Sequence, residues 1–136
     1  MDRLFLDANI LFSAAYRPGS GLSRLWHLDN VELVTSDHAI TEAYRNLQNH
    51  DPLCLQDLNE MIRDMIIVKH VETRDEDPDL LSLPEKDQPI LKAAMVAGAT
   101  HLITGDKRHF GQWFGKRVKG IIVQSPGDYL RDKQVM

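Results

Sequence analysis

Short apolar runs alternate with helix-like segments along the whole chain, and this alternation limits the folds that the chain can adopt. The runs are rich in Leu, Ile and Val and lie at 4–6, 31–35, 65–68, 101–104 and 121–123. Strands that are separated by helices pair mostly in parallel, with helices covering both faces of the sheet. We therefore expect an α/β fold in three layers, α/β/α, around a mostly parallel five-stranded sheet.

Several of the segments between these runs carry helix-start signals. Ser36 and Asp37 are good N-cap residues for a helix that extends to about Asn49. Pro89 is tolerated only in the first turn of a helix, so the next helix begins near Asp87. Further helices are expected directly after the first strand and at 20–28, 52–63 and 126–131. No linker or repeat divides the sequence, so we expect one domain over residues 1–136.

Composition excludes several classes of protein. The chain has 16 Lys and Arg against 20 Asp and Glu, a formal net charge of -4, so no global basic field attracts nucleic acid. Cys54 is the only cysteine, which excludes an intramolecular disulfide and a cysteine-based zinc site. No apolar stretch approaches the roughly 20 residues that span a bilayer. We expect a soluble cytoplasmic protein without a membrane partner.

Four acidic residues lie where strand ends and helix starts are expected, at Asp7, Glu42, Asp87 and Asp106. Two of them, Asp7 and Asp106, follow candidate strands directly, and the carboxyl ends of parallel strands form the usual ligand-binding edge of such a sheet. Carboxylates gathered in one cleft repel each other and lose hydration, so they stay protonated or bind a cation. The pattern predicts one acidic pocket that binds a hard divalent metal.

Each acid also has a simpler explanation. Asp87 could cap the helix that it opens, and Asp7 and Asp106 could cap turns after their strands. Glu42 could be a solvated helix residue paired with Arg45 or Asn46. A shared pocket is favoured because a single site accounts for all four positions.

At these positions the chain resembles the PIN domain family of metal-dependent nucleases, in particular the single-domain prokaryotic members related to VapC toxins. The resemblance covers nearly the whole length. It rests on four segments in the family's order, LDANIL at 6–11, SDHAITEAYRNL at 36–47, KDQPILKAA at 86–94 and LITGDKRHF at 102–110.

The resemblance implies a divalent-metal-dependent endoribonuclease that cleaves RNA phosphodiester bonds and acts as the toxin of a toxin–antitoxin pair. It implies four catalytic and metal-binding acids, Asp7, Glu42, Asp87 and Asp106, that hold one or two Mg²⁺ or Mn²⁺ ions. We expect Asp7 and Asp106 to be the direct ligands. Asn9 and Thr104 are expected to support them through hydrogen bonds, because they are short, polar and uncharged.

Substrate and partner contacts can also be assigned. Lys107, Arg108 and His109 follow the last acid and could contact RNA phosphates, although a short basic cluster is also ordinary surface. His109 could instead ligate a metal or act as a general base. The resemblance further implies an antitoxin that blocks the acidic pocket. A homodimer could form through apolar residues at 55–65, which could equally be core.

The same residues argue against three other functions. A receiver-type signalling domain needs an adjacent acidic pair after the first strand, and Asp7-Ala8-Asn9 supplies one acid there. A haloacid dehalogenase-like phosphatase needs Asp-x-Asp, and Asn9 occupies the second position. A non-catalytic PIN-like module that binds RNA or protein would be marked by loss of one or more acids, and all four are present.

Overall fold

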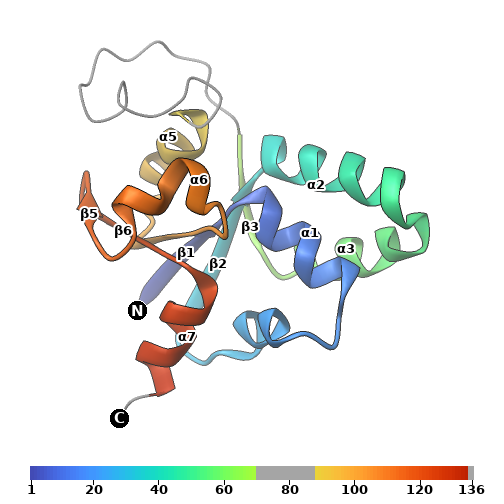
Figure 1. The fold of residues 1–136 in the computed structure, drawn as a ribbon, viewed down its shortest axis with the longest axis horizontal. Coiled ribbons are helices and arrows are strands. Elements are labelled where there is room, and N and C mark those ends of the chain that lie inside the picture. Colours follow the sequence, from blue (N-terminus) through green and yellow to red (C-terminus); the bar gives the residue numbers. More distant parts are fainter. Residues whose placement is uncertain (70–87, 135–136) are drawn as a thin grey trace.

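The computed structural model describes residues 1–69 and 88–134, which form a twisted sheet with helices on both faces (Figure 1). The strands are β1 (Asp2–Leu6), β2 (Val31–Ser36), β3 (Ile66–Val68), β4 (His101–Ile103), β5 (Arg117–Val118) and β6 (Ile121–Gln124). Their order in the sheet is β3-β2-β1-β4-β6-β5. All described pairs are parallel except β5 with β6. The predicted α/β class with a mostly parallel sheet is confirmed.

The sheet formed by residues 1–69 and 88–134 has six strands, which corrects the expected count of five. The additional strand, β5, has two residues and joins β6 through a turn at Lys119 and Gly120, whose φ angles are 54° and 81°. A strand of two residues is too short to give an apolar run in the sequence, so β5 was not predicted. Positive φ at both central residues is typical of a tight hairpin turn.

The helices are α1 (Ala8–Tyr16), α2 (Asp37–His50), α3 (Leu55–Ile62), α5 (Gln88–Val96), α6 (Lys107–Phe110) and α7 (Pro126–Gln134). Short 3-10 helices cover Gly21–His27, Pro52–Cys54 and Gly111–Trp113. The helix expected at 20–28 is therefore present as a 3-10 helix. The other expected helices lie within a few residues of their predicted ends. Among the described helices, none is long and apolar enough to cross a membrane.

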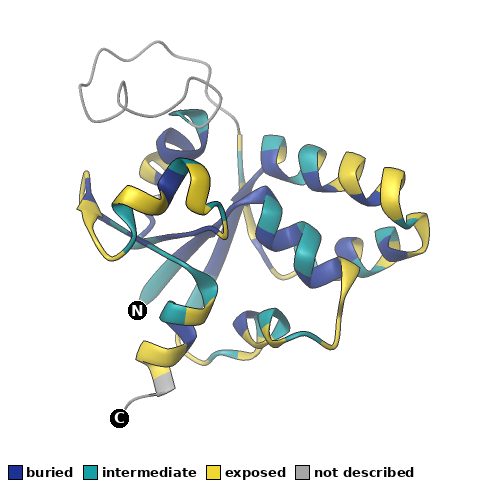
Figure 2. Cartoon of the chain, viewed as in Figure 1, coloured by how far each residue is buried: buried dark blue, intermediate teal, exposed yellow. Residues whose placement is uncertain are grey.

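Two apolar clusters fill the space on either side of the sheet, and β1 contributes to both. Leu4 and Leu6 belong to the cluster under α1, α2 and α3, whereas Phe5 belongs to the cluster under α5. Side chains of a strand alternate between its faces, so a strand buried on both faces reads as a continuous apolar run. Figure 2 shows the central strands as buried and the outer helix surfaces as exposed.

The apolar residues considered for a homodimer mostly serve the core. Leu58 is fully buried, and Leu55, Met61 and Ile62 pack partly buried against the same cluster. The alternative use of residues 55–65, ordinary core packing, is thus the one observed.

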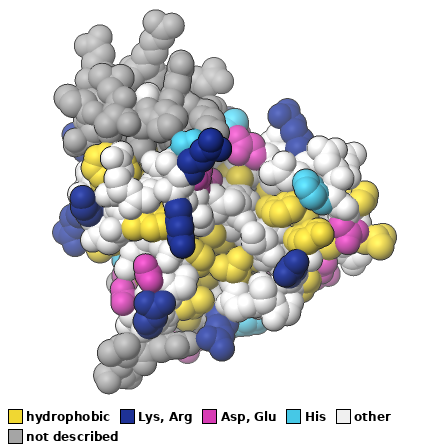
Figure 3. All heavy atoms as spheres, viewed as in Figure 1, with side chains coloured by type: hydrophobic (Ala, Val, Ile, Leu, Met, Phe, Trp, Pro, Cys, Tyr) yellow, Lys and Arg dark blue, Asp and Glu magenta, His cyan; other side chains and the backbone are white. Residues whose placement is uncertain are grey.

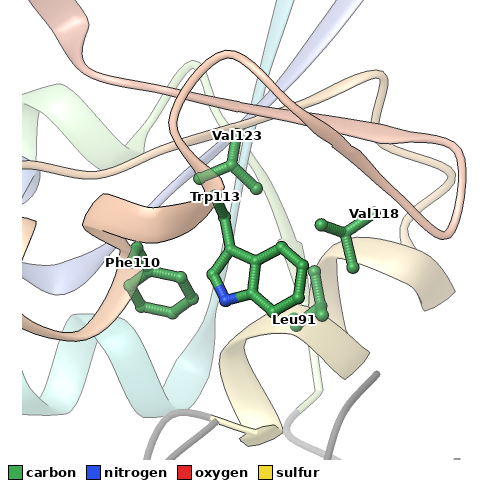
Figure 4. Close-up of a pocket in the computed structure, with 5 residues that line it drawn as sticks. All are labelled: Leu91, Phe110, Trp113, Val118 and Val123. Carbon is green, nitrogen blue, oxygen red and sulfur yellow. The ribbon is translucent and has the colours of Figure 1, made fainter. Parts of the chain in front are cut away.

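In the apolar cluster under α5, the side chains around Trp113 are closely packed. This residue packs with Leu91, Phe110, Val118 and Val123 (Figure 4), and the gap between them has no room for a water molecule. Within the described residues the Trp113 indole nitrogen has no hydrogen-bond partner. This region is a packed core, and α6 is anchored in it by the buried side chain of Phe110.

Candidate active site

Asp7 lies at the carboxyl end of the central strand β1 and caps the helix that follows. Its side chain is only 4% exposed. Oδ1 accepts a hydrogen bond from the backbone N–H of Ala8 at 2.7 Å, and Oδ2 accepts from Asn9 Nδ2 at 3.0 Å and from Thr104 Oγ1 at 2.9 Å. In all three contacts Asp7 is the acceptor, which is the role of an ionised carboxylate.

Thr104 connects Asp7 to Asp106 through hydrogen bonds. It follows β4, which pairs with β1, and its side chain is fully buried. Besides donating to Asp7, its Oγ1 accepts from Asn9 Nδ2 at 3.2 Å and from the backbone N–H of Asp106 at 3.1 Å. The hydroxyl of Thr104 therefore links the two acids that follow neighbouring strands. The supporting role of Asn9 and Thr104 stays a prediction, and these hydrogen bonds favour it.

Asp106 is held by His109, three residues further along α6. Oδ1 of Asp106 accepts from the backbone N–H of His109 at 3.2 Å, and Oδ2 lies 2.7 Å from His109 Nδ1. Partial burial raises the pKa of the Asp106 carboxyl, but the hydrogen bonds and charge of His109 outweigh burial and leave this pKa below its ordinary value. The sequence reasoning missed this partnership. The Asp-x-x-His spacing at a helix start was its only signal.

Within the described residues, Glu42 is not brought together with Asp7 and Asp106. Glu42 lies on α2 with its side chain 44% exposed and pairs with His38 Nε2 at 2.9 Å. The simpler explanation of Glu42 named Arg45 or Asn46 as its partner, but the observed partner, His38, lies one turn before Glu42 on the same helix. Asp87 falls outside the described residues. Within residues 1–69 and 88–134, no three His, Cys, Asp or Glu side chains are arranged to hold a metal ion.

An open pocket of about 370 Å³ adjoins Asp106. It lies between α1, the 3-10 helix Gly21–His27, the turn after β4 and the start of α7, and its lining residues are Asn9, Ile10, Ser13, Leu22, Gly105, Asp106 and Pro126. This pocket was not predictable from the sequence, because its walls come from four separate segments.

Exposed basic side chains occur on α6, directly after Asp106, and at the β5 hairpin. Lys107 and Arg108 are exposed on α6, and Lys116, Arg117 and Lys119 are exposed at the β5 hairpin. Figure 3 shows Lys and Arg side chains over α6 and at the β5 hairpin on the face that it presents. His109, by contrast, is mostly buried against Asp106, with 18% of its side chain exposed.

Fold and site together define an α/β domain with polar and acidic residues at the carboxyl edge of its central parallel strands. The sequence matches the family profile of the PIN domain over residues 3–108. The chain therefore belongs to the PIN domain family. No curated protein matches the sequence significantly.

Three solved structures share this fold. One is VapBC2 from Rickettsia felis, bound to a DNA fragment from its promoter, with 13% identity, a TM-score of 0.64 and coverage of 90% of this chain and 98% of the other. VapC20 from Mycobacterium tuberculosis, a toxin that cleaves the sarcin–ricin loop, has 13% identity, a TM-score of 0.56 and coverage of 77% and 91%. PAE2754 from Pyrobaculum aerophilum has 16% identity, a TM-score of 0.60 and coverage of 99% and 91%.

Proposed function

We propose that this protein is a divalent-metal-dependent endoribonuclease and the toxin of a toxin–antitoxin pair. The observation that carries the proposal is the pair Asp7 and Asp106, joined through the Thr104 hydroxyl at the carboxyl edge of β1 and β4 in a PIN domain. The fold of VapC proteins supports the toxin role by analogy.

The residues present fit a hard cation by their chemistry. Asp7 and Asp106 offer carboxylate oxygens, the ligand type that Mg²⁺ and Mn²⁺ prefer. Asp106 Oδ2 faces His109, so metal binding there requires the imidazole to turn away or to share the carboxylate. When bound, the metal would supply an activated water and stabilise negative charge on the phosphate.

The side chains divide the remaining work. Asn9 and Thr104 hold the Asp7 carboxylate in one orientation, which removes the need to reorganise it during the reaction. Asp7 and Asp106 act as direct ligands, and Glu42 and Asp87 serve a second ion or orient water. For Glu42 this role requires release from His38.

Exposed Lys107 and Arg108 lie on α6, directly after Asp106, where they can contact phosphates of a bound RNA. This local charge would supply the attraction that a chain of net charge -4 lacks overall. His109 acts on the RNA only indirectly, by holding Asp106.

Cleavage of a panel of single-stranded RNA and DNA with Mg²⁺, Mn²⁺ or EDTA tests the nuclease. The wild-type protein should cleave RNA with metal and not with EDTA, and Asp7→Asn should abolish cleavage because it keeps the volume of the side chain but removes its charge. Asp29→Asn, an exposed surface acid outside the site, is the matched control. Calorimetric titration with Mn²⁺ should give one or two sites, weakened in Asp7→Asn and unchanged in Asp29→Asn. An active Asp7→Asn or Asp106→Asn protein would show that the site is misassigned.

The partner roles have separate tests. Co-expression with the product of the neighbouring gene should restore growth of cells that express this protein and should yield a complex. If it does neither, the toxin role is lost while the nuclease remains. The homodimer stays a proposal without an assigned interface, because the apolar residues at 55–65 pack in the core. Light scattering of the purified protein tests it, and a monomer would contradict it.

A further inference from the structure

The open pocket beside Asp106 has walls that differ in chemistry. Ile10, Leu22 and Pro126 supply aliphatic surface from α1, the 3-10 helix Gly21–His27 and the start of α7. Ser13 and Asn9 supply polar groups from the exposed side of α1. At about 370 Å³ the pocket falls within the usual range for small-ligand sites, roughly 300 to 1,000 Å³.

The wall between the pocket and the acids is rigid. Asn9 Oδ1 accepts a hydrogen bond from the backbone N–H of Gly105 at 2.9 Å, while its Nδ2 donates to Asp7 and Thr104. A Cβ built at Gly105 would lie 3.4 Å from Asn9 Oδ1 and 4.0 Å from Ile10 Cδ1, which are ordinary contact distances, so the turn packs directly against α1. The pocket is therefore fixed in position relative to Asp7 and Asp106.

The side chains of Asn9 and Asp106 in this lining already make hydrogen bonds within the described segments of the protein, whereas that of Ser13 does not. The amide of Asn9 is fully used by its neighbours, and both carboxylate oxygens of Asp106 contact His109. The hydroxyl of Ser13 makes no hydrogen bond to any other residue of the described segments. A ligand here meets aliphatic walls and one hydroxyl that is ready to donate or accept.

We infer that this pocket binds one unpaired base of the RNA, in the nucleotide next to the scissile phosphate, and that Ser13 and Leu22 determine which base is preferred. The inference rests on the proposed nuclease function, because the proposed phosphate site at Asp106 places the neighbouring nucleotide at the pocket. A nucleobase has apolar faces and a polar edge, which matches aliphatic walls with a single hydroxyl. Bases are accessible in this way only in single-stranded RNA.

The described residues of the lining include no aromatic ring, so they offer no strong stacking, and discrimination must come from shape and the Ser13 hydroxyl. Losing one hydrogen bond between neutral groups changes an equilibrium by about two- to tenfold. Ser13→Ala should therefore change the relative cleavage of the four bases at one position beside the cut by about that factor. Leu22→Trp should fill the pocket and weaken RNA binding by about tenfold or more.

Leu53→Trp is the matched control for added bulk, because Leu53 is 87% exposed and lies in Pro52–Cys54, outside the pocket lining. Cleavage sites on a randomised single-stranded RNA are mapped by sequencing for the wild type and the variants. In parallel, amide NMR shifts are recorded in EDTA with single-stranded RNA tetranucleotides of each base. Shifts should cluster at Ser13, Leu22 and Gly105, disappear in Leu22→Trp and persist in Leu53→Trp.

The two measurements separate this inference from the nuclease proposal. Clustered shifts that Leu22→Trp removes would support the pocket even if no RNA is ever cleaved. If the wild type cleaves RNA, but Ser13→Ala and Leu22→Trp cut the same bonds at the same relative rates as Leu53→Trp, the nuclease stands and the pocket inference is overturned. Tetranucleotide shifts that avoid the pocket amides overturn it as well.

Discussion

Replacement of Thr104 by Val removes one hydroxyl from the centre of the site while keeping the shape of the side chain. Thr104 is fully buried, and its Oγ1 makes three hydrogen bonds, to the side chains of Asp7 and Asn9 and to the backbone N–H of Asp106. Because Val has the same branched shape, the substitution removes the hydroxyl and leaves the packing volume nearly unchanged. The variant therefore measures how strongly the network depends on this single group.

The expected loss of stability follows from these contacts. A hydrogen bond to a charged group contributes about 1.5–3 kcal/mol, and a buried donor left without an acceptor costs about 1–3 kcal/mol. Because the contacts share one atom and Asp106 is partly exposed, we expect about 2–4 kcal/mol in total. For 136 residues the unfolding entropy gives about 3.5 °C per kcal/mol, so the Tm should fall by about 7–14 °C.

Thr35→Val is the matched control. Thr35 is also fully buried in a parallel strand, but its Oγ1 donates only one hydrogen bond, to the Leu6 carbonyl at 2.9 Å. Its loss should cost about 1 kcal/mol. Urea unfolding monitored by circular dichroism gives both values, and metal-dependent RNA cleavage should fall further in Thr104→Val. If Thr104→Val destabilises the protein no more than Thr35→Val, the hydroxyl does not organise the site and the reasoning is refuted.

Two further predictions concern stability. Ser36→Ala should destabilise the protein by about 1 kcal/mol, because the Ser36 hydroxyl accepts from the Ala39 N–H at 3.0 Å at the start of α2; an unchanged urea midpoint would contradict this capping role. Asp2 is partly buried, which raises its pKa, but Tyr129 and Lys133 lower it further, so its folded pKa lies below the unfolded one. The stabilisation is complete above the unfolded pKa and disappears as pH falls below about 4. Asp2→Asn should therefore be less stable than wild type at pH 7, with a difference that shrinks in acid, and a difference that grows in acid would refute the assignment.

The elements of the fold were largely readable in advance because local signals agreed with the tertiary arrangement. The apolar run at 4–6 became a strand buried on both faces, and Ser36 caps α2 as its sequence context indicated. Two features of the fold, the strand β5 and the 3-10 geometry of Gly21–His27, had no recognisable pattern in the local sequence. The β5 strand forms because a two-residue turn lets it pair with β6, and the 3-10 geometry of Gly21–His27 is a choice that helical spacing does not reveal.

In the candidate site, the positions of the residues were also more predictable from the sequence than the contacts between their side chains. Asp7 and Asp106 were predicted to lie together because the carboxyl ends of adjacent parallel strands meet, whereas Asn9 and Thr104 came from the family resemblance. The structure places all four residues in one hydrogen-bond network. Side-chain partners were less predictable. Glu42 pairs with His38 rather than Arg45, since both lie one turn away on the same helix and only the surroundings select between them.

The sequence by itself determined the layered α/β architecture, the family and the edge of the sheet where the polar residues gather. These depend on periodicity and on residue order, which are local properties of the chain. Only the tertiary structure decided that His109 holds Asp106, that Thr104 joins two acids 97 and 2 residues away from it in sequence, and that four separate segments enclose a pocket beside them. Hydrogen bonds and cavities between distant segments depend on ångström-scale positions, which residue types and spacing do not encode.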